Sequence, residues 1–387
     1  MQLRTPTLLL VTALALLAPR AHAEGEGDWR VSSDTLVYTD SDNVLVVTPQ
    51  VAVAHPLDAG GGAASARVVV DVVSAASVDV VSQATKRFSE VRTEVDLGVS
   101  KAFGKLVPAL SYRHSEEADY VSNGFGAGLL RQLGSSDTTL SVNYDIAFDA
   151  VGYTGTAYSA FAESLRTQNL NASLTQVLGP RTLLRGIYTL THQAGYMAKP
   201  YRFVPLFDSA GIDAAKAAGV SIDLSNFDQY RLSERPAERV PDIRVGHAFG
   251  VRGLRYLESL PGSLHLDAQL FLDSWGIVAA TLEPGLSWKL SERSLLSGYL
   301  RYYQQNGAIF WRRQYVVRAG DLVPRWRTGD RDLSPYYTVT GGARFETRRG
   351  PLTGYVDASV MDTVYSDYMF LTSRLALVSQ LGMRLEL

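Results

Sequence analysis

The chain has 387 residues, of which 46% are hydrophobic and 20% charged, and its formal net charge is -2. So apolar a composition with so little net charge is typical of a folded chain and excludes a disordered one. Without a basic excess the chain is no general nucleic-acid binder, and without cysteine it holds no disulfide, thiolate metal site or cysteine nucleophile.

The first 23 residues have the features of a cleaved secretory signal peptide. Arg4 supplies a positive charge, and residues 8–17 form an apolar run that is too short to span a bilayer as a helix. A small-x-small cleavage motif follows at residues 21–23, which predicts that the mature chain begins at Glu24. An uncleaved membrane anchor is the alternative, and the shortness of the apolar run argues against it.

After this segment, apolar and polar residues alternate strictly, which is typical of strands with two different faces. Between residues 138 and 148, for example, Leu140, Val142 and Tyr144 alternate with serine and asparagine. Each run holds about ten residues, the length with which a tilted strand crosses an outer membrane. The predicted strands are residues 30–39, 44–54, 65–74, 88–101, 105–114, 121–132, 138–148, 165–178, 181–194, 240–257, 263–273, 277–290, 294–304, 334–347, 351–364 and 371–387.

The connections between these runs are alternately short and long, except that two links on the long side, near residues 115–120 and 274–276, are themselves short. Gly179-Pro180-Arg181 is typical of the short turns, whereas residues 195–239 and 305–333 form the two longest loops. Outer-membrane barrels have short periplasmic turns and longer outer loops. The sequence therefore predicts an all-β fold, in which residues 24–387 form one transmembrane antiparallel β-barrel of about sixteen strands with long extracellular loops.

The end of the chain resembles the terminal signal by which the outer-membrane assembly machinery recognises its clients. Gln380, Gly382, Leu385 and Leu387 occupy the polar, glycine and two apolar positions of that motif. Leu387 departs from it, because most such proteins end in an aromatic residue. We therefore expect this machinery as a partner, together with outer-membrane lipid and lipopolysaccharide. The edge strand of a soluble β-sandwich is the alternative.

A tandem octapeptide at residues 70–85 and several other segments resemble a known family. The octapeptides are Val-Asp-Val-Val-Ser-Ala-Ala-Ser and Val-Asp-Val-Val-Ser-Gln-Ala-Thr, and the other segments are residues 38–40, 87–92, 175–184, 200–205, 238–242 and 273–276. Together they are similar to an uncharacterised bacterial family, domain of unknown function three-five-seven-zero, over nearly the whole mature chain. The resemblance implies an outer-membrane barrel with no established activity, so no site residue can be carried over.

The octapeptide repeat also holds two candidate acidic contacts for a solute. Asp71 and Asp79 take the same position in the two copies. If the repeat forms a strand pair that folds into a lumen-facing loop, both carboxylates lie in water inside the barrel. A plain hairpin of β-branched residues is the alternative.

Loop 305–333 is basic and aromatic. Arginine pairs bidentately with phosphates, and aromatic side chains stack on rings. The loop could therefore hold an anionic solute, lipopolysaccharide phosphates or a partner protein, and plain solvation is the alternative. Its candidate contacts are Arg312, Arg313, Arg325 and Arg327, interleaved with Phe310, Trp311, Tyr315 and Trp326.

Loop 195–239 is too long to be a mere connector. Alanines at four positions between residues 214 and 218 predict a short helix within residues 208–219, because alanine has the highest helix propensity. The loop is dense in charges of both signs and could fold into the pore as a constriction or plug. A solvated surface loop is the alternative.

Catalytic and metal-binding patterns are sparse. The histidines are scattered without a His-Glu-x-x-His motif, and no spacing singles out a Ser-His-Asp triad. Ligand-type side chains cluster at residues 114–119, His-Ser-Glu-Glu-Ala-Asp, in a predicted outer link. Calcium or zinc there is an alternative to a solvated turn. The sequence predicts no enzyme, no cofactor, no metal centre and no nucleic-acid partner.

The predicted lumen is lined by charges of both signs, and a barrel this wide normally encloses water. We therefore expect a channel or uptake protein for a small polar or anionic solute, in the outer membrane of a Gram-negative bacterium. A plugged barrel that acts as a structural or partner-binding scaffold is the alternative, and an outer-membrane hydrolase is the third possibility. Predicted lumen-facing residues include Arg67, Arg92, Glu94, Asp96, Arg113, Asn143, Asp145, Asn171, Arg185, Asp267, Gln269, Glu283, Lys289, Arg301, Arg344, Glu346 and Arg384.

Overall fold

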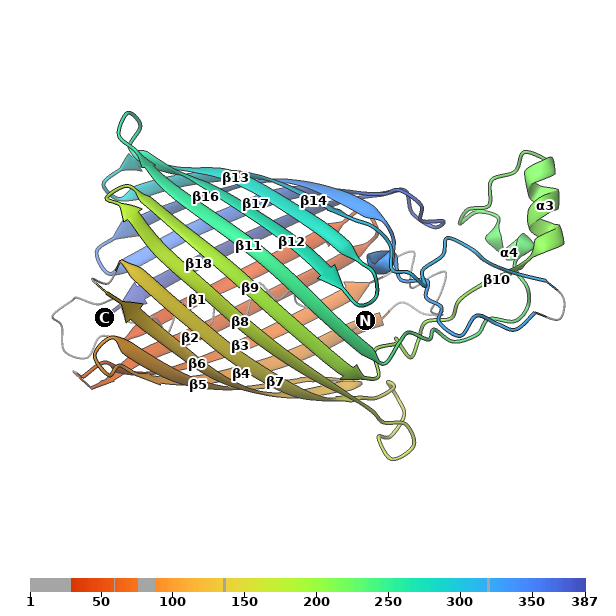
Figure 1. The fold of residues 1–387 in the computed structure, drawn as a ribbon, viewed down its shortest axis with the longest axis horizontal. Coiled ribbons are helices and arrows are strands. Elements are labelled where there is room, and N and C mark those ends of the chain that lie inside the picture. The colour runs from red at the N-terminus through yellow and green to blue at the C-terminus, as the bar shows by residue number, and fades with distance from the viewer. Residues whose placement is uncertain (1–28, 59, 76–87, 135–136, 319–320) are drawn as a thin grey trace.

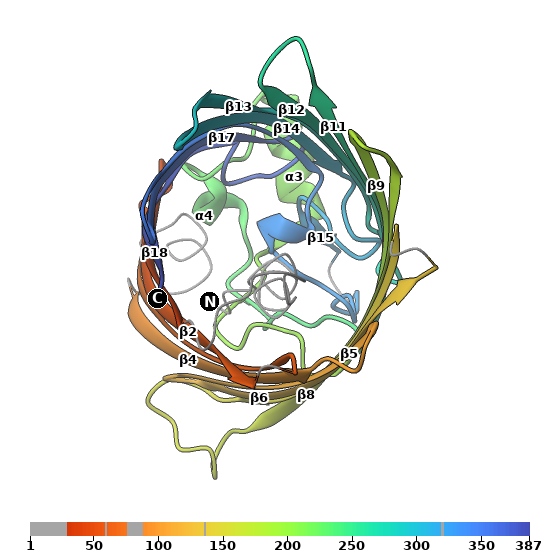
Figure 2. The same cartoon turned by 90° about the vertical axis from the view of Figure 1, so that its left-hand side faces the viewer.

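The structure is a computed structural model that describes residues 29–58, 60–75, 88–134, 137–318 and 321–387. The predicted signal peptide and Asp79 lie outside the described residues. The described chain forms a barrel with a smaller body at one end (Figures 1 and 2).

Sixteen antiparallel strands close the barrel, as the alternation predicted. The first and last strands pair with each other, with Arg30 opposite Glu386 and Asp40 opposite Ala376. The sheet therefore has no free edge to which another strand could add. The barrel strands are β1 (Arg30–Asp40), β2 (Val44–Asp58), β3 (Gly62–Ala75), β4 (Phe88–Lys101), β5 (Leu106–Glu117), β6 (Tyr120–Leu133), β7 (Thr138–Val151), β8 (Glu163–Gly179), β9 (Thr182–Gly195), β11 (Ile243–Leu257), β12 (Gly262–Asp273), β13 (Val278–Ser291), β14 (Ser294–Gln305), β16 (Tyr336–Arg349), β17 (Leu352–Tyr365) and β18 (Ser373–Glu386).

The strands present an apolar face outward and a polar face to the lumen. On β7, Tyr144 and Phe148 are exposed in the outward row, while Asn143 and Asp145 belong to the inward row. Outward leucines and valines continue this apolar surface around the barrel. A closed sheet with an apolar exterior and a polar lumen satisfies all its backbone groups inside a bilayer, and it is the architecture of transmembrane barrels of the outer-membrane type.

The longest connections all lie at one end of the barrel, as predicted, although β1–β2 and β5–β6 are short links at that same end. At the end of the barrel where the C-terminus lies, β8 and β9 or β13 and β14 are joined by only two residues (Figure 1). The long connections emerge at the opposite end, between β9 and β11 and between β14 and β16. In outer-membrane barrels the short-turn end faces the periplasm, so we call the opposite end the outer end.

The two longest loops fold together into a body that we call the cap, residues 196–242 and 306–335. It contains β10 (Leu206–Asp208), α3 (Ser209–Ala217), α4 (Phe227–Tyr230), β15 (Tyr315–Val317) and a short 3-10 helix, η1 (Arg331–Leu333). The strands β10 and β15 pair in parallel and so join the two loops. The helix predicted within residues 208–219 is α3, whose first turn is capped by the Asp208 carboxylate. Among the described residues, no helix is long and apolar enough to cross a membrane.

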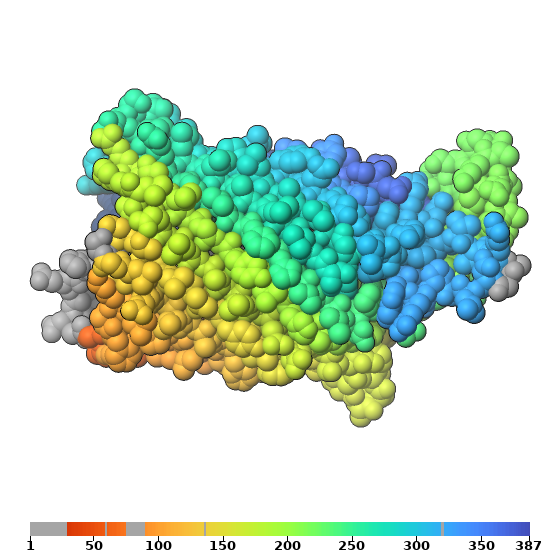
Figure 3. Space-filling model, viewed as in Figure 1, coloured from red at the N-terminus to blue at the C-terminus, as the bar shows by residue number. Residues whose placement is uncertain are grey.

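The cap extends beyond the outer rim of the barrel (Figures 1 and 3). In the view along the barrel, α3, α4 and β15 lie within the outline of the wall (Figure 2). The loops therefore cover part of the outer mouth. From the sequence, these loops could either fold into the pore or lie on the surface. In the structure they do neither completely, because they lie over the outer mouth and extend beyond the rim.

Candidate functional site

On one side of the lumen, wall charges pair between neighbouring strands. The predicted candidate Asp71 on β3 accepts hydrogen bonds from Arg92 on β4 (Nε–Oδ2 2.7 Å) and from Thr48 on β2 (2.5 Å). Arg67 forms ion pairs with Asp96 (2.6 Å) and Glu94 (3.2 Å). Asp71 is therefore part of a structural ladder of ion pairs along the wall, and not an isolated acidic group in water.

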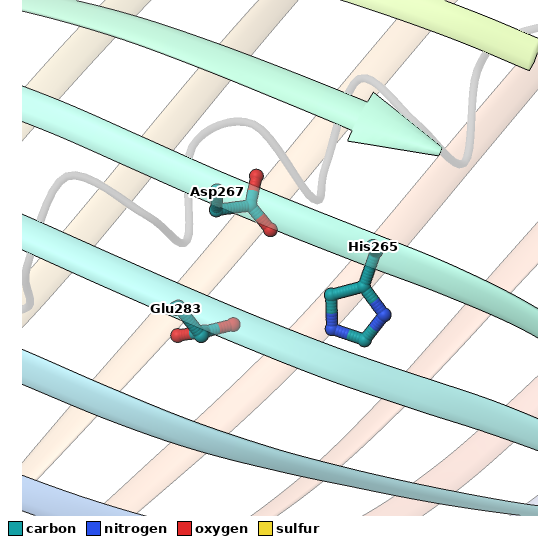
Figure 4. Close-up of side chains that lie close together, drawn as sticks. All are labelled: His265, Asp267 and Glu283. Carbon is teal, nitrogen blue, oxygen red and sulfur yellow. The ribbon is translucent and has the colours of Figure 1, made fainter. Parts of the chain in front are cut away.

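A second ladder crosses β11 to β14. Its two carboxylates, Asp267 and Glu283, lie beside His265 (Figure 4). A ring nitrogen of His265 and one carboxylate oxygen each of Asp267 and Glu283 lie within 4.8 Å of one another. Arginines on the neighbouring strands neutralise both carboxylates. Arg252 pairs with Asp267 at 2.5 Å, and Arg301 lies 3.9 Å from Glu283. This group could ligate a metal ion, but its charges are already neutralised by the two guanidinium groups.

Glycines on the lumen face let aromatic rings lie flat against the wall. A Cβ atom at Gly382 on β18 would lie 2.4 Å from the ring of Tyr355 on β17, so only glycine leaves room for that ring. The guanidinium group of Arg344 lies over the same ring, 3.8 Å from its centroid. Gln380 donates to Asp34 at 2.6 Å. Two residues of the predicted terminal signal thus also pack the lumen wall.

The two leucines of the terminal signal lie elsewhere. Leu385 belongs to the outward row of β18, between Val31 and Leu352 on the neighbouring strands. Leu387 follows the strand and is exposed, and its backbone N–H donates to the carbonyl oxygen of Trp29 at 2.8 Å. The predicted division between a polar inward face and an apolar outward face therefore extends to the end of the chain.

Buried ion pairs hold the two loops of the cap together. Arg202 from the first loop pairs with Asp330 from the second (2.6 Å) and with Glu238 (3.2 Å). Thr328 donates to Glu238 at 2.6 Å, and Lys199 pairs with Asp330 at 3.1 Å. Burial by itself would raise the pKa of Asp330, but Arg202 and Lys199 outweigh it and hold that pKa well below its usual range. We call these five residues the cap anchor.

Other contacts fix the cap to the barrel. Arg331 of η1 forms a buried ion pair with Asp42 in the turn between β1 and β2. Gln305 at the end of β14 donates to the carbonyl oxygens of Asp332 and Ser334, at 2.9 and 2.8 Å. The cap therefore has a defined position at the outer mouth.

An apolar cluster lies beside these polar contacts. It packs residues of the cap against residues of other outer loops, so that the outer end of the molecule has its own apolar core. Trp275, between β12 and β13, contacts Phe310 edge to face, with ring centroids 5.2 Å apart. The cluster also includes Phe207, Ile212, Phe227, Trp311, Tyr368 and Phe370.

The four predicted arginines of the second loop fall into two groups. Arg312 donates to the carbonyl oxygens of Ile309 and Trp311, at 2.8 and 2.7 Å. Arg313 lies 3.5 Å from Asp367 in the loop between β17 and β18. Both arginines line a small cavity between the cap and the loop that joins β17 to β18.

Of the other two, Arg325 lies over Trp326, whereas the Arg327 guanidinium donates to the carbonyl oxygens of Ala237 and Pro324. Arg325 is 4.5 Å from the centroid of the Trp326 ring, and Arg239 from the first loop lies at 5.5 Å. Arg327 pairs through its backbone with Arg239, and burial together with the Arg239 charge lowers its pKa. The association of Arg239 with Arg327 was not predicted, because the two residues lie 88 positions apart in the sequence and no local pattern joins them. We call Arg239, Arg325, Trp326 and Arg327 the Trp326 cluster, and they present three positive charges at the outer end.

A serine nucleophile needs a base such as histidine within hydrogen-bond reach. Among the described residues, no serine hydroxyl is hydrogen-bonded to a histidine ring.

Comparisons with known proteins identify a family and distant structural likenesses. A family model described as "Protein of unknown function (DUF3570)" matches residues 79–354. No curated protein matches the chain. Among solved structures, the siderophore receptor PirA from Acinetobacter baumannii is 11% identical with a TM-score of 0.45, and the match covers 89% of this chain and 53% of the receptor.

Two further structures are similarly remote. CdiB from Acinetobacter baumannii is 10% identical with a TM-score of 0.49, covering 93% of this chain and 61% of CdiB. A bacterial polysaccharide outer membrane secretin is 7% identical with a TM-score of 0.48, covering 95% of this chain and 100% of the secretin. The chain thus spans little more than half the length of the receptor, and these likenesses are too remote to assign a function.

Proposed function

The chain belongs to the family of proteins of unknown function DUF3570, whose description names no activity, and we propose that it is an outer-membrane channel or uptake protein for a small polar or anionic solute. The observation that carries this proposal is a closed barrel of sixteen strands with a charged and polar wall. With a strand spacing of about 4.8 Å and a tilt of about 40°, a barrel of sixteen strands has a diameter of about 32 Å, measured from backbone to backbone. Inward side chains leave an aqueous passage in barrels of this size.

The cap supplies the preference for an anion. The wall carries both signs in neighbouring pairs, so it produces no strong field of one sign. The Trp326 cluster, in contrast, gathers Arg239, Arg325 and Arg327 at the outer mouth. A cluster of one sign at a mouth raises the local concentration of counter-ions there.

Conductance across a planar bilayer tests this proposal on refolded mature protein. We expect ion current from the wild type, a larger current when the cap is replaced by two short linkers, and an anion preference that the replacement abolishes. Arg325→Gln with Arg327→Gln should lower the anion preference, while Arg349→Gln, an exposed arginine at the short-turn end, should leave it unchanged. Absence of current with and without the cap would defeat the channel proposal.

One observation favours the alternative of a partner-binding scaffold. The cap has its own apolar core and its own buried ion pairs, so it is a folded body with a fixed surface. A non-conducting barrel whose cap binds another envelope protein would have the same features. The bilayer experiment separates the two functions, because a scaffold need not conduct even after its cap is removed.

A further inference from the structure

A group of three carboxylates at the outer rim belongs neither to the wall ladders nor to the cap anchor. Glu90 comes from β4, Glu117 is the last residue of β5, and Asp119 lies in the turn to β6. Thr93 lies opposite Glu116 in the β4–β5 register, and the same register continued by three residues brings Glu90 opposite Asp119. One carboxylate oxygen of each residue lies within 4.8 Å of those of the other two.

Glu117 is the residue that makes this group unusual. It is only 8% exposed, and its Oε2 atom is buried without a hydrogen-bond partner within the described residues. Arg92, which the register brings opposite Glu117, donates instead to Asp71. Burying a carboxylate oxygen without a donor costs several kcal/mol on the order-of-magnitude scale for buried charges. A cation held between the three carboxylates satisfies that oxygen and removes the repulsion between them.

We propose that Glu90, Glu117 and Asp119 form a calcium site. Calcium prefers hard oxygen ligands at about 2.3–2.6 Å, so two oxygens on opposite sides of the ion lie about 4.8 Å apart. The three oxygens meet this limit without rearrangement of the backbone. Magnesium binds at about 2.1 Å and demands a tighter octahedral shell, while zinc favours nitrogen and sulfur ligands.

The His265 group shows why proximity alone is insufficient. Asp267 and Glu283 have guanidinium partners on the adjoining strands, so a divalent ion there would have to displace them. Glu117 has a buried oxygen that accepts no hydrogen bond from the part of the chain that the structure describes. The rim group therefore gains more from binding a cation than the His265 group does.

The site also connects the barrel to the cap. The Tyr201 hydroxyl donates to Asp119, and its oxygen accepts from the backbone N–H of Thr154 at 2.5 Å. A bound ion fixes Asp119 and thereby one attachment of the first cap loop to the rim.

The test is calcium titration of the refolded mature protein in an uncharged detergent after treatment with a chelator. Isothermal calorimetry should detect one site with a dissociation constant on the order of 0.1–1 mM, the range of extracellular calcium modules. Terbium, which replaces calcium and luminesces when tyrosine transfers energy to it, should report the same site through Tyr201. Magnesium should bind at least about tenfold more weakly.

Two matched variants decide the result. Glu117→Gln should weaken calcium binding at least about tenfold, because it removes a ligand charge while keeping the side-chain shape. Glu116→Gln, which removes an exposed charge from the adjacent outward position, should bind like the wild type. In chelator, Glu117→Gln should melt no lower than the wild type, which shows that the variant is folded.

Absence of calcium binding by the wild type, or equal binding by Glu117→Gln, would overturn the proposal. Equal weakening by the Glu116 and Glu117 variants would also overturn it, because general surface charge would then explain the binding. The site does not depend on conduction through the barrel, so a non-conducting protein that binds calcium would refute only the proposed function.

Discussion

Charged side chains occupy both the lumen wall and the cap, but the two regions hold them differently. In the wall, Arg67 and Asp96 pair across neighbouring strands with side chains 16% and 20% exposed. In the cap, Arg202 and Glu238 pair across a loop with side chains 8% and 2% exposed. The Arg67–Asp96 pair therefore keeps more contact with water than the Arg202–Glu238 pair, although another wall pair, Arg92 with Asp71, is also largely buried at 11% and 7% exposed.

This difference in solvation predicts a difference in tolerance. An exposed ion pair typically contributes about 0–1 kcal/mol, because water solvates each partner when the other is removed. Loss of one partner from a buried pair costs about 3–5 kcal/mol, because an uncompensated charge remains inside. Arg67 in the wall should thus tolerate substitution better than Arg202 in the cap.

The largest expected effect is that of Arg202→Met, which leaves Glu238 and Asp330 without their shared guanidinium group. We expect the cap to lose about 3–5 kcal/mol of local stability and to open, while the barrel remains folded. Limited proteolysis should cleave the cap of the variant faster than that of the wild type. Heat-modifiable migration on gels should show an intact barrel.

Lys216→Met is the control for this experiment, because Lys216 lies in α3 of the cap but is exposed. Its cleavage rate should match that of the wild type, apart from cleavage at the substituted site itself. Equal protection of the Arg202 variant and the wild type would mean that the anchor is dispensable, and the contrast between the two regions would fail.

The wall is the region that could be read from the sequence. Alternation assigns each strand residue to one face, so Arg67, Glu94 and Asp96 could be placed in the lumen without knowing any partner. Short turns then fix which strands are neighbours. The particular pairs, such as Arg67 with Asp96, depend on the pairing register of neighbouring strands, which cannot be deduced from the sequence.

The cap could be read only in part. Helix propensity acts locally, and the alanines between residues 214 and 218 predicted α3. The pairing of Arg331 with Asp42 joins residues 289 positions apart, and the rim carboxylate Glu90 meets Glu117 across two strands. Contacts of this kind form only when the closed barrel brings distant segments together, so no local sequence pattern predicts them.

The next effect concerns the outer face of the wall. Leu385→Asp puts a charge into the outward row of β18, where a charged group costs up to about 2–4 kcal/mol at mid-membrane and less near the rim. We expect reduced insertion and degradation in the periplasm, because Leu385 also belongs to the predicted terminal signal. Immunoblots of outer-membrane fractions measure the loss.

Arg384→Gln is the matched control, since Arg384 is adjacent but belongs to the inward row. It should insert like the wild type, because its side chain meets water and not lipid. Equal amounts of the two variants in the membrane would contradict the assignment of the two faces of β18.

The smallest effect should follow from Arg67→Met in the lumen wall. The two carboxylate partners of Arg67 each have another arginine nearby. Arg92 lies 4.0 Å from Glu94, and Arg113 lies opposite Asp96 in the β4–β5 register. Lumen water solvates whatever charge remains, so we expect a loss of about 1 kcal/mol or less in the free energy of unfolding by denaturant. The reversal potential in a salt gradient should shift slightly toward cations, because one positive charge has left the wall. A loss as large as that of Arg202→Met would mean that the wall pairs are desolvated like the cap pairs, and the lumen would then be too dry to serve as a channel.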